Sequence, residues 1–175
     1  MKKLAVFIGS VLLGVLIAAL YGALHDQVTY TISPEYYTRF KYGQFGVEPE
    51  WFGGHRPTVA VIGAWATWWM GFFISIILGL ISLGFRNHKR MFTSIFKAIF
   101  LTIACTILTE IVGGIAGVVT ASADADWIPA EVTDKKAFYI VGFIHDFAYL
   151  GGVLGLVAGI VYVILAKRKE EKQLA

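Results

Sequence analysis

Ionisable residues interrupt two apolar segments of this sequence, and their types are those used in metal binding and proton transfer. Glu110 lies inside one segment, and His145 and Asp146 lie inside another. Histidine and carboxylate side chains bind zinc, iron or manganese without help from cysteine. Histidine also titrates near neutral pH, which suits a proton relay. Such residues are costly within a bilayer and face the interior of a helix bundle, so they indicate a functional site.

A short pattern links these residues to a second His-Asp pair. Residues 22–26 and 142–146 share the pattern Gly-x-x-His-Asp. The first pair closes an apolar segment, so both pairs are expected toward the same side of a membrane. The candidate metal or proton-relay residues are His25, Asp26, Glu110, His145 and Asp146, with Glu35, His55 and Tyr149 as supporting candidates.

Three interpretations of this set follow from its chemistry. The first is a site for a divalent metal ion such as zinc or iron, although the spacing differs from the Glu-x-x-His pattern of di-iron helix bundles. The second is a path for protons or ions, with Glu110, His145 and Asp146 as relay groups. The third is a structural hydrogen-bond network that fixes the register of the helices.

The elements that must position these residues follow from composition. Only 15% of the residues are charged, whereas about a quarter are charged in a soluble domain. Four apolar segments span residues 4–24, 58–85, 98–121 and 137–166. A helix needs about 20 residues to cross a hydrocarbon core of ~30 Å, and each segment reaches that length. The sequence therefore predicts a single integral membrane domain of all-α fold, a four-transmembrane-helix bundle.

Glu110 and His145 are predicted to share one site in this bundle. At ~1.5 Å per residue, Glu110 lies ~16 Å and His145 ~11 Å from the outer ends of their helices. Each also lies on a glycine-rich helical face, which packs against a neighbouring helix and not against lipid. We therefore expect the two side chains to meet inside the bundle and to be energetically coupled.

The distribution of Lys and Arg predicts the orientation in the membrane. Ten of these residues flank the termini and the 86–97 connection, and five lie in the 26–57 and 122–136 connections. Because cytoplasmic loops carry the excess of Lys and Arg, both termini and residues 86–97 are predicted to be cytoplasmic. Residues 26–57 and 122–136 then form external loops. A multi-pass protein of the plasma (inner) membrane is expected.

The first external loop is long enough to carry structure of its own. Residues 28–32 alternate in polarity as a short strand does. Ser33 followed by Pro34 is typical of a helix start, with Ser33 as N-cap. The aromatic and basic residues that follow, up to residue 45, predict a short helix at the outer membrane interface. At the other end of the chain, the residues after Lys167 are expected to fray.

The sequence also narrows the classes of function. Its basic residues occur in short clusters beside apolar segments, so nucleic acid is not an expected partner. Gly-rich phosphate loops, nucleophile elbows and Ser or Cys triads do not occur, so no enzyme class is assigned. We expect a small membrane protein that binds a metal ion or relays protons. The alternative is a non-enzymatic scaffold or accessory subunit, with the lipid bilayer, a second copy of the chain or another membrane subunit as partners.

Overall fold

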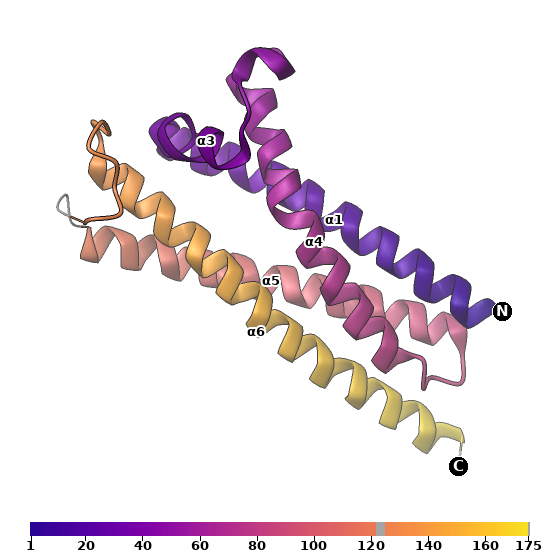
Figure 1. Cartoon of the computed structure of the whole chain (residues 1–175). Helices are drawn as coiled ribbons and strands as arrows, with labels where there is room; N and C mark the ends of the chain where they lie inside the picture. The colour runs from indigo at the N-terminus through magenta and orange to yellow at the C-terminus, as the bar shows by residue number, and fades with distance from the viewer. Residues whose placement is uncertain (122–124, 175) are drawn as a thin grey trace.

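Four long helices make up most of the molecule. The computed structural model describes residues 1–121 and 125–174. The helices are α1 (Lys2–Ile32), α4 (His55–Ser82), α5 (His88–Thr120) and α6 (Lys135–Leu174), as Figure 1 shows. All four are long and apolar enough to cross a membrane, and no strand occurs in the described ranges. The predicted all-α fold with four membrane-spanning helices is therefore confirmed.

The four helices associate as two tight pairs, α1 with α4 and α5 with α6. Small residues recur every four positions on the packed faces, and Gly22 of α1 lies backbone to backbone against Gly63 of α4. One turn away, the Thr67 hydroxyl of α4 donates to the Ala18 carbonyl of α1 at 2.7 Å. Between lipid-embedded helices, small residues allow this close approach and the dispersion contacts that follow. Contacts between the two pairs are much fewer, so the space between them is the loosest part of the bundle.

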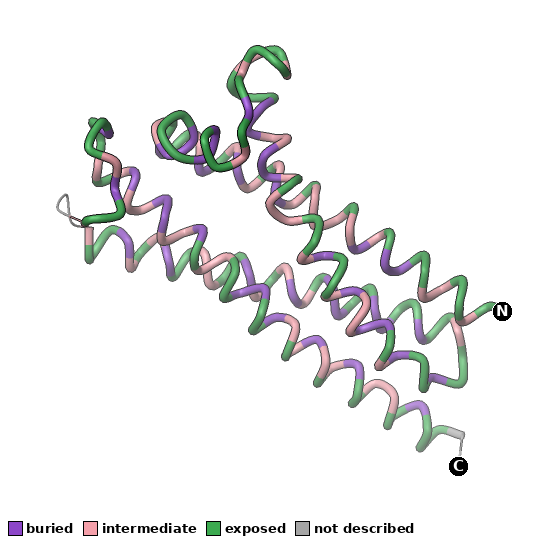
Figure 2. Tube along the Cα trace, viewed as in Figure 1, coloured by how far each residue is buried: buried purple, intermediate pink, exposed green. Residues whose placement is uncertain are grey.

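The outward sides of the helices are apolar and exposed. Figure 2 shows exposed residues along the outer side of each long helix. On α1 they recur every fourth residue, with Leu12 66% and Leu24 69% exposed. Large apolar side chains in such positions are satisfied by lipid tails, as in a membrane-spanning bundle.

The two ends of the bundle differ. Both chain termini and the α4–α5 connection lie at one end, and the other end carries residues 33–54 and 125–134 (Figure 1). We call the second the loop end. Part of the predicted 122–136 loop, including Asp124, lies outside the described residues.

Helix α1 continues past its predicted end, and the predicted strand at residues 28–32 is wrong. These five residues form the last turn and a half of α1, after which the Ser33 amide donates to the Thr29 carbonyl at 2.9 Å. The alternating polarity gave a wrong prediction because a five-residue pattern is too short to distinguish the strand period of two residues from the helix period of 3.6. The consequence is that His25 and Asp26 lie well inside a helix and not at its boundary.

The helices predicted for α5 and α6 were also too short at the end of the bundle that holds the chain termini. Helix α5 already begins at His88, with the Asn87 side chain accepting from the Lys89 amide at 2.8 Å. The expected fraying after Lys167 is wrong, because α6 continues to Leu174. Its Glu170 is buried and accepts from the amides of Arg86 and Asn87 at 2.8 and 3.2 Å. Charged flanks were assigned to loops because they are polar, but Lys, Arg and Glu are good helix formers.

A short helical run follows α1 at the loop end, as predicted. It comprises α2 (Pro34–Tyr36), the π-helical turn η1 (Tyr37–Lys41) and α3 (Tyr42–Phe45). The Ser33 side chain accepts from the Tyr36 amide and Pro34 opens the helix, which confirms the predicted start. The run ends at Gly46 with a φ of 63°, and the 3-10 turn η2 (Pro49–Phe52) leads into α4.

Candidate functional site

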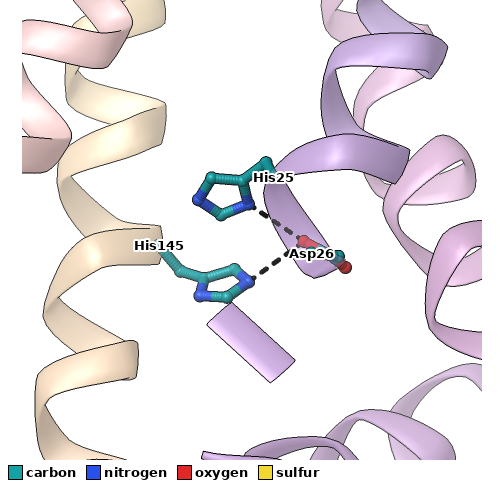
Figure 3. A group of neighbouring side chains, drawn as sticks. All are labelled: His25, Asp26 and His145. Atoms are coloured by element: carbon teal, nitrogen blue, oxygen red, sulfur yellow. Dashed lines mark hydrogen bonds and ion pairs between the residues drawn. The ribbon is translucent and has the colours of Figure 1, made fainter. Parts of the chain in front are cut away.

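Three candidate residues meet between the two helix pairs, in the half of the bundle nearer the loop end. His25 and Asp26 come from α1 and His145 from α6, and both rings face the Asp26 carboxylate in Figure 3. Asp26 Oδ1 lies 3.0 Å from His25 Nδ1 and 3.4 Å from His145 Nε2. Asp26 is 3% and His145 7% exposed, so the group is shielded by protein on nearly all sides.

Glu110 joins this group from α5. Its Oε1 lies 3.4 Å from His25 Nε2 and accepts a hydrogen bond from the Tyr21 hydroxyl. The side chains of Tyr21, Glu110, His25, Asp26 and His145 thus form one continuous series, which we call the polar chain. Within this series, His25 and Asp26 lie between Glu110 and His145 and link them. The energetic coupling expected between Glu110 and His145 remains a prediction, and His25 and Asp26 are the residues that would transmit it.

The backbone fixes the tautomer of His145. Its Nδ1 lies 2.9 Å from the Val141 carbonyl, one turn earlier in α6. A carbonyl oxygen can only accept, so Nδ1 carries the proton. In the neutral ring, Nε2 then carries no proton, and its lone pair is free on the side of Asp26. This pattern, in which one ring nitrogen bonds a backbone carbonyl or carboxylate and the other is free, is typical of metal-binding histidines.

Three atoms of the group are buried and have no hydrogen-bond partner in the part of the chain described. They are His25 Nε2, Asp26 Oδ2 and His145 Nε2. The 3.4 Å separations are therefore close enough for charge attraction but lack hydrogen-bond geometry. Each unpaired buried group costs about 1–3 kcal/mol, and a cluster of three in one place calls for a bound species or a functional role.

The helical run after α1 covers the cluster. The Tyr36 ring stacks on the His145 ring with centroids 4.8 Å apart, and the Tyr37 ring lies at 6.3 Å. The Tyr37 hydroxyl is 2.6 Å from Thr29 Oγ1. Burial, and then the negative charges of nearby carboxylates, raise the pKa of both phenols, so they remain neutral. Tyr36 and Tyr37 of the predicted interfacial helix are therefore buried against protein, whereas Phe40 of the same run is 39% exposed.

Lys41 lies in the same cover and is an unusual buried cation. It is 5% exposed, with Nζ 5.7 to 5.8 Å from the rings of Tyr36, Phe40 and Phe45. Burial lowers the pKa of this amine, while the charges of Asp26 and Asp146 oppose that shift. Aromatic faces attract a cation and partly replace the water it has lost.

The remaining candidates lie outside the cluster. Asp146 is exposed, and no hydrogen bond to Tyr149 is present in the described residues. Glu35 accepts from the amides of Thr133 and Asp134, and this holds its pKa below the usual range. His55 Nδ1 lies 3.0 Å from the Tyr42 hydroxyl. Tyr149 stacks on Trp69.

Sequence reasoning missed Tyr21, Tyr36, Tyr37 and Lys41. Tyr21 had a usable signal, because it lies one helical turn before His25 and therefore on the same face. The other three had none, because their approach to His145 depends on how the run after α1 folds back over the bundle.

A cavity of about 100 Å³ lies beside the polar chain, between the two helix pairs. His25, Asp26 and His145 form part of its wall, and most of the rest is apolar. No protein-family model matches the chain, and no curated protein or solved structure shows significant similarity to it. The function of the protein is therefore inferred from the geometry of the cluster.

Proposed function

We propose that this protein binds a divalent transition-metal ion, such as zinc or iron, inside the membrane. The ligands are His25 Nδ1, Asp26 Oδ1 and His145 Nε2. One ligand atom from each of the three residues fits within a group no wider than 4.8 Å. Bonds of ~2.1 Å around a tetrahedral ion place ligand atoms ~3.4 Å apart, close to the 3.0 and 3.4 Å seen here.

The observation that carries the proposal is the use of the two ring nitrogens. Each histidine turns one nitrogen to Asp26, and its other nitrogen faces a fixed acceptor. For His145 that acceptor is the Val141 carbonyl, at 2.9 Å from Nδ1, and for His25 it is the Glu110 carboxylate, at 3.4 Å from Nε2 and without a hydrogen bond. Outer acceptors of this kind orient metal-binding imidazoles and raise their basicity. A purely structural network would have no reason to leave the Asp26-facing nitrogen of His145 unpaired.

Charge supports the same conclusion. Asp26 brings a carboxylate into a buried site, and a divalent cation supplies the opposite charge. An uncompensated carboxylate at this depth is costly. Three protein ligands also leave a coordination position open, as in catalytic zinc sites and unlike closed structural ones.

A proton relay is the second candidate, favoured by the succession of ionisable groups from Tyr21 to His145, each 3.4 Å or less from the next. Elemental analysis separates the two functions. Protein purified without chelator, or reloaded with zinc or iron, should hold about one ion per chain if the site is a metal centre. A relay would move protons across vesicle membranes with no bound metal.

Two variants and one control locate the ion. Asp26→Asn and His145→Gln should lose most of the bound metal, because each removes a ligand. Asp146→Asn should retain it, because the neighbouring carboxylate is exposed and outside the cluster. Wild-type protein that stays metal-free after reloading, or equal loss in Asp146→Asn, would refute the metal site. Size-exclusion profiles verify that each variant remains folded.

A further inference from the structure

The residues that line the cavity beside the polar chain follow the helices over several turns, and we call this cavity the slot. Its wall on α1 extends from Gly14 to Asp26, and Gly14 lies against Ser75 of α4 at the far end. Twelve residues of helix rise ~18 Å. A volume of about 100 Å³ spread over such a length suits an extended chain better than a compact molecule.

Most hydroxyls on the sides of this slot already form hydrogen bonds; the slot is also lined by Tyr21, whose hydroxyl donates to Glu110, and by Tyr149. The hydroxyls of Thr67, Thr102 and Thr106 line it, but each donates to a backbone carbonyl four residues earlier, at 2.8 to 3.0 Å. The Ser75 hydroxyl is buried and unpaired in the described residues, and it lies at the end far from the cluster. Apolar cavities of this kind stay dry and take up apolar molecules.

The end near the cluster is polar, and its free atoms are acceptors. Asp26 Oδ2 is a carboxylate oxygen, and it is buried and unpaired. His145 Nε2 also accepts, because its ring proton is held on Nδ1 by the Val141 carbonyl. A ligand that pairs with these two atoms must therefore donate a hydrogen bond. While no metal ion is bound, the buried Asp26 carboxylate repels an anionic head group at this low dielectric.

We infer that the slot binds a neutral amphiphile from the lipid phase, with a hydroxyl head and a narrow apolar body. The hydroxyl donates to Asp26 Oδ2, and the body lies along the slot toward Ser75. A metal ion on Asp26 Oδ1 leaves Oδ2 free, so this site does not require the proposed metal and does not compete with it.

The test uses a dodecanol that carries a photoreactive diazirine in its chain, with wild-type protein in lipid nanodiscs. Saturable labelling is expected on the slot wall, in the peptides around Met70 and Ile103. Plain dodecanol should compete. In protein stripped of metal by a chelator, its methyl ether, which has no donor, and dodecanoate, which is anionic, should not compete. Competition by the ether or the acid as strong as by the alcohol would overturn the inference, as would labelling that does not saturate.

A filled slot provides a matched comparison. Ala148 lines the slot, whereas Ala104 is exposed on the outer side of α5. Ala148→Leu should reduce labelling at least about tenfold, a loss of 1.4 kcal/mol in binding, and Ala104→Leu should leave it unchanged. Metal content measured in the same samples keeps the two proposals apart. Specific labelling of metal-free protein supports the slot alone, and bound metal without specific labelling supports the metal centre alone.

Discussion

Two histidines that share one carboxylate oxygen, but reach it with different ring nitrogens, determine the chemistry of this site. His25 uses Nδ1 and His145 uses Nε2. His25 can do so because Asp26 follows it directly on α1, so Nδ1 is the nearer nitrogen. His145 approaches from another helix, and its Nδ1 is occupied by the carbonyl of Val141. The selection of nitrogens therefore follows from local backbone geometry.

Glu110 is predicted to strengthen metal binding without being a ligand. Glu110→Gln keeps the size of the side chain but replaces the carboxyl group that faces His25 Nε2 with an amide. Loss of such an outer partner costs about 10–100-fold in metal affinity, which competition titration with a chelator measures. Affinity in both proteins should rise with pH through the histidine range, because the ligands must lose their protons.

Glu131→Gln is the control for this prediction, because Glu131 is an exposed carboxylate outside the polar chain. Equal affinity in wild type, Glu110→Gln and Glu131→Gln would show that Glu110 has no part in the site.

At the scale of elements, the sequence was enough to predict the helices but not how they pack against one another. Apolar length alone identified four spans, and the Ser33–Pro34 pair located the start of the helical run after α1. The depths of Glu110 and His145 predicted that they share one site, and in the structure each lies beside His25. Asp146 was assigned to the set because it adjoins His145, but it points to the exposed side. Adjacent residues on a helix differ by about 100°, so a neighbour in sequence need not share the face.

The contact between Gly22 and Gly63 is predicted to set the position of α1, and hence of His25 and Asp26. A Cβ at residue 63 would overlap the Gly22 carbonyl. Gly63→Ala should therefore push α1 from α4, at a cost of about 1–3 kcal/mol, and weaken metal binding. Thermal unfolding and metal titration measure the two effects.

Gly9→Ala is the matched control on α1, because a Cβ there meets nothing within 4 Å. It should leave both stability and metal affinity unchanged. If Gly63→Ala behaves as Gly9→Ala does, the close approach does not position the site.

The attachment of the helical run after α1 is predicted to weaken in acid. The Glu35 carboxylate accepts from the amides of Asp134 and Thr133, which lowers its pKa. Because the folded pKa is the lower one, the stabilisation is complete above the unfolded value of ~4.3 and is lost as pH falls through the folded value. Amide exchange at Thr133 and Asp134 should accelerate over that interval, beyond the intrinsic change.

Glu35→Gln should show weak protection at these two amides at every pH, since a neutral amide is a poorer acceptor. Glu48→Gln, which changes an exposed carboxylate of the same loop, should behave as wild type. Acid-independent protection in wild-type protein would contradict this role of Glu35.

For the whole molecule, the arrangement of two pairs explains why the site lies where it does. Each pair is closed by small residues, and the polar groups occupy the looser space between pairs. His25 and Asp26 belong to one pair, and Glu110 and His145 to the other. A bound ion would therefore connect two halves that otherwise touch sparingly, and metal removal should loosen them.

The orientation in the membrane determines the side from which the site is reached. Both termini and the α4–α5 connection share one end of the bundle (Figure 1). That end carries ten Lys and Arg residues against five at the loop end. We propose that the ten-residue end is cytoplasmic, because cytoplasmic segments retain the positive charge. The cluster, nearer the loop end, then belongs to the outer half of the membrane.

Cysteine labelling in intact cells tests this orientation, after Cys105, the single native cysteine, is replaced by Ala. Gln44→Cys and Asp126→Cys place thiols at exposed positions of the loop end, and Arg90→Cys places one at the opposite end. A membrane-impermeant maleimide should react with the first two in intact cells and with the third only after permeabilisation. The reverse pattern would place the loop end in the cytoplasm and the cluster in the inner half. The proposed metal and slot sites would keep their geometry but would be supplied from the other side.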